Sequence, residues 1–386
     1  MNISWHGGLF YTQKSHANLN RRLVLALQEL GHNVKTNFAN TDFDQFDKWN
    51  PEHAAVNKAA LNTSFQETDY NIYKLMALEG KEGEYINIPP QKFNCVLHSD
   101  GAYTIGKSTQ DLLLSQPVTH LWLPTPCNAT VVNQQLEMPV EGFGCDSGIN
   151  PDMFHIEIEP HNYGLPRGTF VFMIACDGLN KTPSRPGGGF RGTDMALEAY
   201  LTEFTNEEPV CLIIKVGRPH STYAEKVTMW KKQMFPESGL IGVDGGLETQ
   251  KVMATKYSAV HCMLSPIRDA RWEACCLEAL ACGTPCIATD CGGPKLWGKK
   301  GVYHLPYTIR DGDLTESRKQ EPIGKDLWTE LSVVELKKKM RWAFENRAKV
   351  QNDGFNGAIY VYGNWKWVDV AQRVVDWFKK EEEGNE

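Results

Sequence analysis

The residue with the clearest chemical signature in this chain is Glu278, a carboxylate within the segment 271–293, RWEACCLEALACGTPCIATDCGG. Its immediate neighbours are Ala, Leu and Cys, and this apolar setting predicts a short buried helix. Because an unpaired buried charge is costly, the carboxylate needs a partner. The sequence leaves two partners open: the backbone amides at a helix N-terminus, or the hydroxyl groups of a bound sugar.

The residues that follow Glu278 predict an anion-binding turn. Gly283-Thr-Pro turns the chain into a buried strand over Cys286–Thr289, and Gly292-Gly293 comes shortly after it. Adjacent glycines leave backbone amides uncovered, and α/β proteins bind anionic ligands at the carboxyl ends of their strands. The segment therefore combines a carboxylate suited to hydroxyl groups with a turn suited to phosphate.

The cysteines and the acidic triplets predict no metal centre. The chain has 11 cysteines, and the group between Cys275 and Cys291 includes no Cys-x-x-Cys pair. Such thiols are typical of apolar packing in a reducing cytosol. The two Asp-x-Asp triplets, Asp42-Phe-Asp44 and Asp311-Gly-Asp313, follow no clear apolar strand, so we expect both to be solvated loops. We expect neither a metal nor a cofactor.

Length and composition favour two globular domains. A chain of 386 residues is too long for one ordinary core, and 41% hydrophobic with 23% charged residues is typical of globular proteins. We expect no transmembrane helix and no secretory signal, because the apolar runs are too short, and we therefore expect a cytoplasmic protein. A net charge of −7 argues against a general nucleic-acid binder.

Strand-like and helix-like segments alternate along the chain, which predicts parallel sheets covered by helices. The segment 156–167 carries Pro160, Gly164 and Pro166 with little periodicity and is predicted to be an interdomain linker. The expected strands are 2–5, 34–38, 93–97, 120–123, 169–175, 210–216, 240–243, 259–264 and Cys286–Thr289. The expected helices are 16–30, 108–115, 130–135, 192–204, 223–232, 247–257, 332–346 and 367–380.

The fold class that follows is α/β, with two Rossmann-like doubly wound domains facing a cleft. We expect the first domain over residues 1–155 and the second over 168–366, with the linker between them. The helical segment 367–386 is expected to pack back on the first domain. A cleft between the carboxyl ends of two sheets suits a reaction of two substrates from which water is excluded.

In these features the chain resembles the retaining GT-B glycosyltransferases of family 4, the glycosyl transferases group 1. The segment 271–293 is similar to the family pattern of an acidic residue, an aromatic residue, Leu-Glu-Ala-x-Ala-x-Gly-x-Pro and a Gly-Gly turn. The segments LGHNV, GCDSGINPDMFHI and FRGTDMALEAY resemble three further family patterns in the right order. The resemblance covers nearly the whole chain and implies an acceptor-side first domain and a nucleotide-sugar-binding second domain.

Two family positions differ here. The first Glu of the family pattern, eight residues before the second, is Ala270 in this chain. Either Asp269 takes its place, or Glu273 faces the site, or the donor sugar lacks that contact. Arg191 stands where the family has Lys, and three residues compete for the role of its partner Arg: Lys181, Arg185 and Lys215.

The resemblance implies a role for each candidate residue of the donor site. The leaving diphosphate needs cations and backbone amides, for which the candidates are Gly7, Gly8, Arg191, Lys215, Gly292 and Gly293. For Arg191 and Lys215 the alternative is an ordinary surface Arg and a Lys whose stem alone is buried. Glu278 is expected to bind the ribose, Asp269 the transferred sugar, and Val243 and Asp244 the base.

On the acceptor side the resemblance singles out His98, which ends the apolar run FNCVL and is expected to touch the sugar or the reacting centre. A structural histidine is the alternative. Asp100 and Tyr103 follow it as acceptor-side candidates. Three aromatic residues, Trp5, Tyr103 and Trp122, are suited to stacking on a sugar or a base, or to filling the core.

The implied reaction transfers a hexose from UDP or GDP to an unidentified acceptor, which is a glycan, a small molecule or a modified base. It retains configuration by front-face attack, and the departing phosphate helps to deprotonate the acceptor. Three other functions stay open: a GT-B hydrolase, epimerase or phosphorylase; a nucleotide-sugar-binding protein without turnover; and a phage-type nucleic-acid base glycosyltransferase.

Overall fold

The computed structural model describes residues 1–6, 15–37, 70–74, 88–97, 107–176, 191–217, 221–246, 248–269, 271–312 and 326–384. Its contacts divide the chain into two compact units. The first contains Met1–Gly148 together with Trp365–Glu386, and the second contains Ile149–Asn364. The segment 156–167, expected to be a linker, therefore belongs to the second unit.

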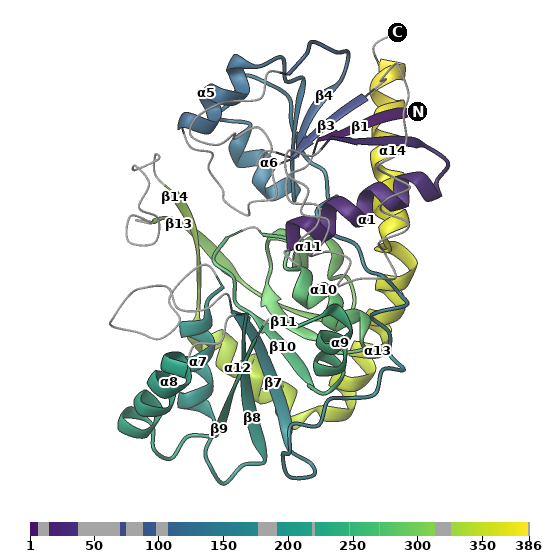
Figure 1. The fold of residues 1–386 in the computed structure, drawn as a ribbon. Helices are drawn as coiled ribbons and strands as arrows, with labels where there is room; N and C mark the ends of the chain where they lie inside the picture. The colour runs from purple at the N-terminus through teal and green to yellow at the C-terminus, as the bar shows by residue number, and fades with distance from the viewer. Residues whose placement is uncertain are drawn as a thin grey trace. The chain divides into compact units, whose positions relative to one another are not determined.

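The first unit is built on a six-stranded sheet in the order β2-β1-β3-β4-β5-β6, and all its ladders are parallel. Its helices α5 and α6 lie on one side of the sheet and α1 and α14 on the other (Figure 1). The strands are β1 (Asn2–His6), β2 (Asn33–Asn37), β3 (Tyr70–Lys74), β4 (Asn94–Leu97), β5 (His120–Leu123) and β6 (Val140–Gly142). The helices are α1 (Ser15–Glu29), α5 (Lys107–Ser115), α6 (Pro126–Val132) and α14 (Trp367–Gly384).

Alternation along β5 explains both faces of this sheet, because successive strand residues point to opposite sides. Leu121 and Leu123 pack into the core under α5 and α6, whereas Trp122 meets the ring of Trp377 on α14, edge to face at 4.9 Å. Phe378 of the same helix lies against Tyr70 of β3, with ring centroids 4.2 Å apart. The end of the chain is thus part of the first unit's core.

The second unit also has a six-stranded parallel sheet, in the order β12-β11-β10-β7-β8-β9. The strand order reverses between β7 and β10, which is the switch point where such sheets bind ligands. The strands are β7 (Phe170–Cys176), β8 (Val210–Val216), β9 (Leu240–Gly245), β10 (Cys262–Ser265), β11 (Cys286–Thr289) and β12 (Val302–Leu305).

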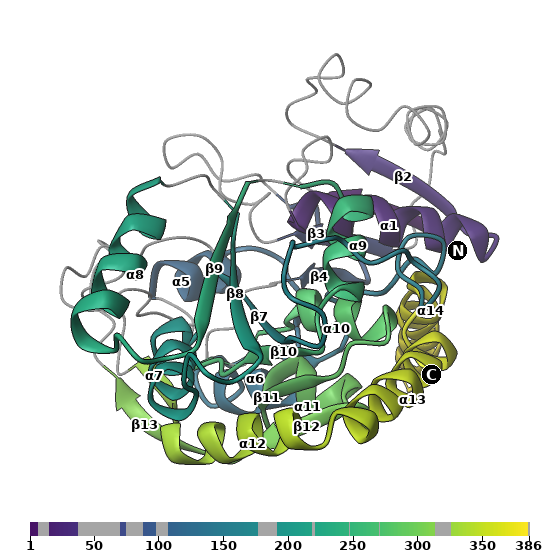
Figure 2. The ribbon, with the colours of Figure 1, turned by 90° about the horizontal axis from the view of Figure 1, so that it is seen from below.

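Seven helices of the second unit are described, and α12 and α13 follow each other as one run along one side of it (Figure 2). They are α7 (Thr193–Glu203), α8 (Ser221–Met234), α9 (Gln250–Ser258), α10 (Ala274–Ala281), α11 (Gly292–Trp297), α12 (Val333–Glu345) and α13 (Arg347–Asn364). A hydrophobic core fills the space between α7, α12 and the sheet, with Phe172, Leu212 and Leu336 completely buried.

The predicted fold class is confirmed, and the differences from the predicted elements have simple causes. Strand β3 is missed because YNIYK mixes polar and apolar residues, and α13 because its sequence is polar and contains several glycines. Asp311 was predicted to lie in a loop, and this was wrong: it belongs to β13 (Tyr307–Gly312), which pairs antiparallel with β14 (Asp326–Leu331). Asp42-Phe-Asp44 lies outside the described residues.

No helix among the described residues is long and apolar enough to cross a membrane.

Candidate functional site

The described part of the candidate site lies in the second unit, at the carboxyl ends of its parallel strands. Its carboxylates and cations come from the loop before α7, from β8 and β9, and from the segment between β10 and α11. The remaining predicted site residues lie outside the described residues, and so do two competing cations: Gly7, Gly8, His98, Asp100 and Tyr103, with Lys181 and Arg185.

Glu278 lies on α10 and faces α9. Its Oε2 accepts a hydrogen bond of 3.3 Å from the hydroxyl of Tyr257, a residue that is 1% exposed. Burial raises the pKa of Glu278 to about 7, and the Tyr257 hydrogen bond acts in the opposite direction. The partner of this carboxylate is therefore a tyrosine hydroxyl from the next helix, which the sequence did not indicate.

Glu273 directly precedes α10 and lies at the switch point between β7 and β10. Its carboxylate accepts from Arg191 Nη1 at 3.2 and 3.3 Å and from the Ser265 hydroxyl at 3.0 Å. Its backbone is left-handed, with φ of 56°, which is unfavourable for a residue with a Cβ. A buried carboxylate held in this conformation beside a cation is typical of a binding site.

Asp269 is also buried, but Arg271 occupies its carboxylate. Arg271 Nε donates to Oδ1 at 2.8 Å and to Oδ2 at 3.0 Å, and its Nη2 donates to Oδ2 at 2.5 Å. Two-pronged pairs of this kind are among the stronger ion pairs in proteins. Both carboxylate oxygens are thus engaged by a residue two positions along the chain.

Gly292 and Gly293 begin α11, and the structure distinguishes their backbones. The Gly293 amide donates to the Arg271 carbonyl at 3.0 Å. A Cβ on Gly293 would lie 2.0 Å from the Trp272 carbonyl oxygen and 2.6 Å from Trp297 Nε1. Gly293 therefore permits a close backbone approach that fixes the segment before α10, and its amide is already used.

Lys215 is the penultimate residue of β8, where it pairs in register with Asp244 of β9. It is 5% exposed, and its Nζ donates to the Gly246 carbonyl at 2.6 Å and lies 3.8 Å from Asp244 Oδ1. Lys256 of α9 binds the same carboxylate at 2.7 Å. Burial would lower the pKa of Lys256, but Asp244 and Glu248 outweigh it and raise that pKa.

Helix α9 joins these groups, because the neighbouring residues Lys256 and Tyr257 reach Asp244 and Glu278 respectively. Cys275 lies among the other charges: its thiol interacts electrostatically with Arg191, Glu278 and Glu273, and burial raises its pKa to about 12. The structure thus brings Arg191, Glu273 and Glu278 into one neighbourhood. Such a site offers carboxylates to hydroxyl groups and cations to phosphate.

Sequence reasoning missed Tyr257, Lys256 and Arg271 as parts of this site. Arg271 could have been found from its position after β10, because ligands bind outside the carboxyl ends of strands at a switch point. Lys256 and Tyr257 precede that strand, and no sequence signal marked them. Trp5 and Trp122, considered for stacking, are 0% and 1% exposed and belong to the core. The described residues contain no group of three or more His, Cys, Asp or Glu that could hold a metal ion.

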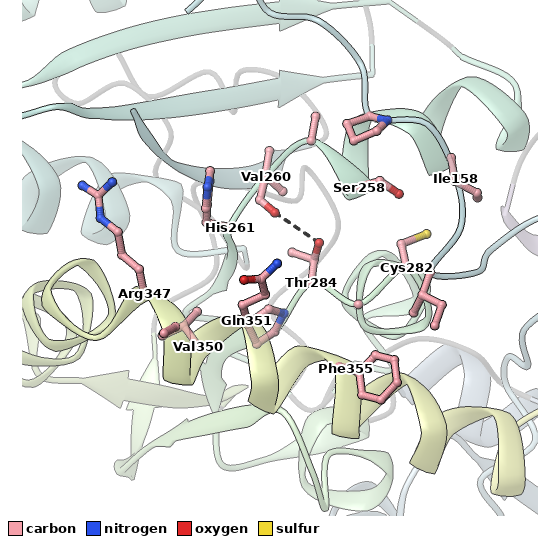
Figure 3. Close-up of a pocket in the computed structure, with 16 residues that line it drawn as sticks. Ile158, Ser258, Val260, His261, Cys282, Thr284, Arg347, Val350, Gln351 and Phe355 are labelled. Carbon is pink, nitrogen blue, oxygen red and sulfur yellow. Dashed lines mark hydrogen bonds between the residues drawn. The ribbon is translucent and has the colours of Figure 1, made fainter. Parts of the chain in front are cut away.

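A separate pocket of about 530 Å³ opens at the opposite, amino edge of the second sheet (Figure 3). Residues 258–261, which precede β10, and 282–285, which precede β11, line it together with the first turns of α13. Strands β10 and β11 separate this pocket from the carboxyl edge. Four residues of strand span about 13 Å, so the pocket is distinct from the candidate site.

Comparisons with known proteins give a family match for part of the chain and a fold match for nearly all of it. Residues 191–317, which carry the described site, match the family model described as glycosyl transferases group 1. No curated protein sequence matches the chain. Among solved structures, sucrose-phosphate synthase from Thermosynechococcus elongatus superposes with a TM-score of 0.61 at 12% identity, covering 100% of both chains.

Two further structures share the fold at similar distance. Anabaena HepE, solved in complex with UDP and glucose, has a TM-score of 0.59 at 11% identity and covers 98% of this chain and 100% of its own. WaaG, a glycosyltransferase involved in lipopolysaccharide biosynthesis, has a TM-score of 0.57 at 12% identity, with 97% and 99% coverage. The family match assigns residues 191–317 to the glycosyl transferases group 1, and the solved structures show that the chain has the GT-B fold. With this matched region the protein is a glycosyltransferase that transfers a sugar from a nucleotide-sugar donor.

Proposed function

We propose that this enzyme transfers the hexose of a UDP-hexose or GDP-hexose donor to its acceptor with retention of configuration. The observation that carries the proposal is the Glu278 carboxyl, half-buried on α10 and held by Tyr257 within the stretch that matches the family model. Anabaena HepE, a structure of similar fold, was solved with UDP-glucose, which supports a hexose donor of this class.

Different residues of the site bind different parts of the donor. Glu278 accepts from the ribose hydroxyls, and the β9 turn at Val243 and Asp244 receives the base. Arg191 and the Gly292 amide face the diphosphate, where negative charge grows as the glycosidic bond breaks. Lys215 supports the base-binding turn through Gly246 and Asp244.

For the transferred sugar we propose Glu273 rather than Asp269 as the hydroxyl acceptor. Arg271 holds both oxygens of Asp269 at 2.5 to 3.0 Å, whereas Arg191 reaches Glu273 through one nitrogen at 3.2 and 3.3 Å. Because its contacts with Arg191 are longer than those of Asp269 with Arg271, Glu273 is better able to exchange the arginine for a sugar hydroxyl, while Ser265 keeps its hydrogen bond of 3.0 Å. Glu273 also lies at the switch point itself.

The test is a thermal-shift screen of UDP- and GDP-hexoses against the protein and its Glu278→Gln variant. A ligand that binds only the native state raises the melting temperature. We expect one nucleotide-sugar to do so in the wild type and far less in the variant. Incubation of that donor with candidate acceptors, with NMR assignment of the product anomer, then checks retention. An inverted product or equal shifts in both proteins would contradict the proposal.

A donor-binding protein without turnover is the second candidate. Ala270 stands where the resemblance implies a carboxylate, and Asp269 beside it is occupied by Arg271. Under this alternative the thermal shift would be observed, but neither transfer nor donor hydrolysis would follow with any acceptor.

A further inference from the structure

We propose that Tyr257 is a positioning residue for Glu278, whose carboxyl it orients for recognition of a donor hydroxyl. The inference deepens the proposed function and rests on the role proposed there for Glu278. Its physical basis, however, is a contact between two residues of the enzyme, and that contact is measurable without any donor.

The first observation is geometric. Tyr257 is 1% exposed on α9, and its hydroxyl reaches 3.3 Å across to Oε2 of Glu278 on α10. Within the described residues this is the hydrogen bond that reaches the Glu278 carboxylate. One oxygen therefore has a fixed protein donor, and the other oxygen is directed by it. A carboxylate oriented in this way binds a ligand hydroxyl with less loss of side-chain entropy.

The second observation is that Tyr257 is itself anchored. The Thr284 hydroxyl, in the turn after α10, lies 2.7 Å from the Tyr257 carbonyl and 3.2 Å from the Val260 carbonyl. Figure 3 shows Thr284 pointing at Val260 from the turn that follows Gly283. The end of α9 is thus tied to the end of α10. The two helices that carry Tyr257 and Glu278 cannot easily separate at this point.

The third observation concerns the titratable groups around Glu278. Tyr257 faces it from α9, and the thiols of Cys275 in α10 and Cys282 directly after α10 interact with it. From α13, Tyr362 donates to the Ala281 carbonyl at the end of α10. Burial raises the pKa of both thiols to about 12, so they remain neutral at physiological pH. Arg191 and Glu273 meet at the other end of the helix.

Because burial opposes ionisation of Glu278, the Tyr257 hydroxyl has a definite effect on it. A hydrogen bond donated to the charged form favours that form and lowers the pKa. Loss of this donor should raise the pKa of Glu278 by about one unit. With a wild-type pKa of about 7, the ionised fraction at pH 7 would then fall about fivefold.

The experiment compares Tyr257→Phe with the wild type, and uses Tyr200→Phe as the matched control. Tyr200 is a buried tyrosine of the same unit, and its hydroxyl donates to the carbonyls of Leu240 and Val210. The pKa of Glu278 is measured by carbon-13 NMR of glutamate carboxyls, assigned with Glu278→Gln, in donor-free protein. We expect a rise in Tyr257→Phe and no change in Tyr200→Phe. An unchanged Glu278 pKa in Tyr257→Phe would overturn the inference.

Activity gives the second measurement, with the donor found in the thermal-shift screen. We expect the donor KM of Tyr257→Phe to rise about fivefold at pH 7 and to approach the wild-type value near pH 9, with kcat little changed. A KM increase that is equal at both pH values would indicate a merely structural role and contradict the inference. If no nucleotide-sugar binds the wild type, the proposed function fails, while the donor-free pKa comparison still decides the role of Tyr257.

Should Tyr257→Phe fail to fold, replacement of Tyr257 by 3-fluorotyrosine keeps the shape and the hydroxyl. Fluorine makes that hydroxyl a stronger donor, so the pKa of Glu278 is expected to fall, opposite to the effect of phenylalanine. A rise or no change in the fluorinated protein would contradict the proposal.

Discussion

At the scale of single residues, the chemistry of the proposed site depends on which carboxylates are available to a ligand. Glu278 accepts a hydrogen bond from Tyr257, and Glu273 accepts from one nitrogen of Arg191. Both carboxylate oxygens of Asp269 are paired with Arg271. Burial sets the cost of each arrangement, because a buried carboxylate that loses its partner is left uncompensated. These three carboxylates therefore have different expected responses to amide substitution.

Glu278 should make donor binding depend on pH. Its pKa is raised to about 7 by burial, and donor hydroxyls favour the ionised form. Affinity for the nucleotide-sugar is therefore expected to increase as the pH rises through about 7. Glu278→Gln should remove this dependence and lower kcat/KM about ten- to hundredfold. Calorimetric titration of both proteins between pH 6 and 9 checks this, and parallel pH profiles would disprove it.

We expect amide substitution of Asp269 to lower the stability of the protein, and amide substitution of Glu273 to impair sugar recognition. Asp269→Asn breaks a buried pair, so we expect the free energy of unfolding to fall by about 3 kcal/mol. Glu273→Gln keeps an acceptor for Ser265, and we expect it to fold normally and lose about ten- to hundredfold in kcat/KM. Urea unfolding and donor kinetics, measured on both variants, distinguish the stability role from the recognition role. A stable Asp269→Asn protein with impaired sugar recognition would assign the sugar contact to Asp269.

At the scale of elements, helix starts and tight turns place the site. Gly293 lets α11 begin against the segment 271–272, which fixes the approach to Glu273. Gly293→Ala would place its Cβ 2.0 Å from the Trp272 carbonyl oxygen, so we expect a loss of at least about 2 kcal/mol in stability. Gly363→Ala on α13 is the control, because nothing lies within 4 Å of its Cβ. There we expect no loss, or a gain of up to about 1 kcal/mol, in chemical denaturation. Equal losses in both variants would contradict the steric argument.

At the scale of the whole molecule, the chain returns at its end to the unit in which it began. Trp377 and Phe378 of α14 are buried against Trp122 and Tyr70 in the first unit. Phe378→Ala should therefore cost about 3–5 kcal/mol and destabilise the first unit. Hydrogen exchange should speed up in α1 and β3, while α7 and β8 stay protected. Ile359→Ala, at a residue 54% exposed on α13, serves as the control and should be nearly neutral. Loss of protection confined to the second unit would refute this assignment.

The architecture could be predicted from the sequence, and the segment 271–293 was proposed from it as the main part of the site. Apolar runs of strand length, such as 210–216 and Cys286–Thr289, predicted strands correctly because strands buried on both faces are almost wholly apolar. The spacing of Glu278, Gly283 and Gly292-Gly293 likewise followed from local rules for helices and turns. The sequence did not predict β3 or α13, because their polar residues hide the periodicity.

The partners of the charged residues could not be predicted from the sequence and are given by the assembled fold. Tyr257 lies 21 residues before Glu278, and Glu273 lies 82 residues after Arg191, so no local pattern joins either pair. Lys215 stands in an apolar strand, which suggested a phosphate ligand, yet its ammonium group donates to the Gly246 carbonyl. Hydrogen bonds and ion pairs act over about 3 to 4 Å, and that proximity arises only when the sheet and its helices are assembled.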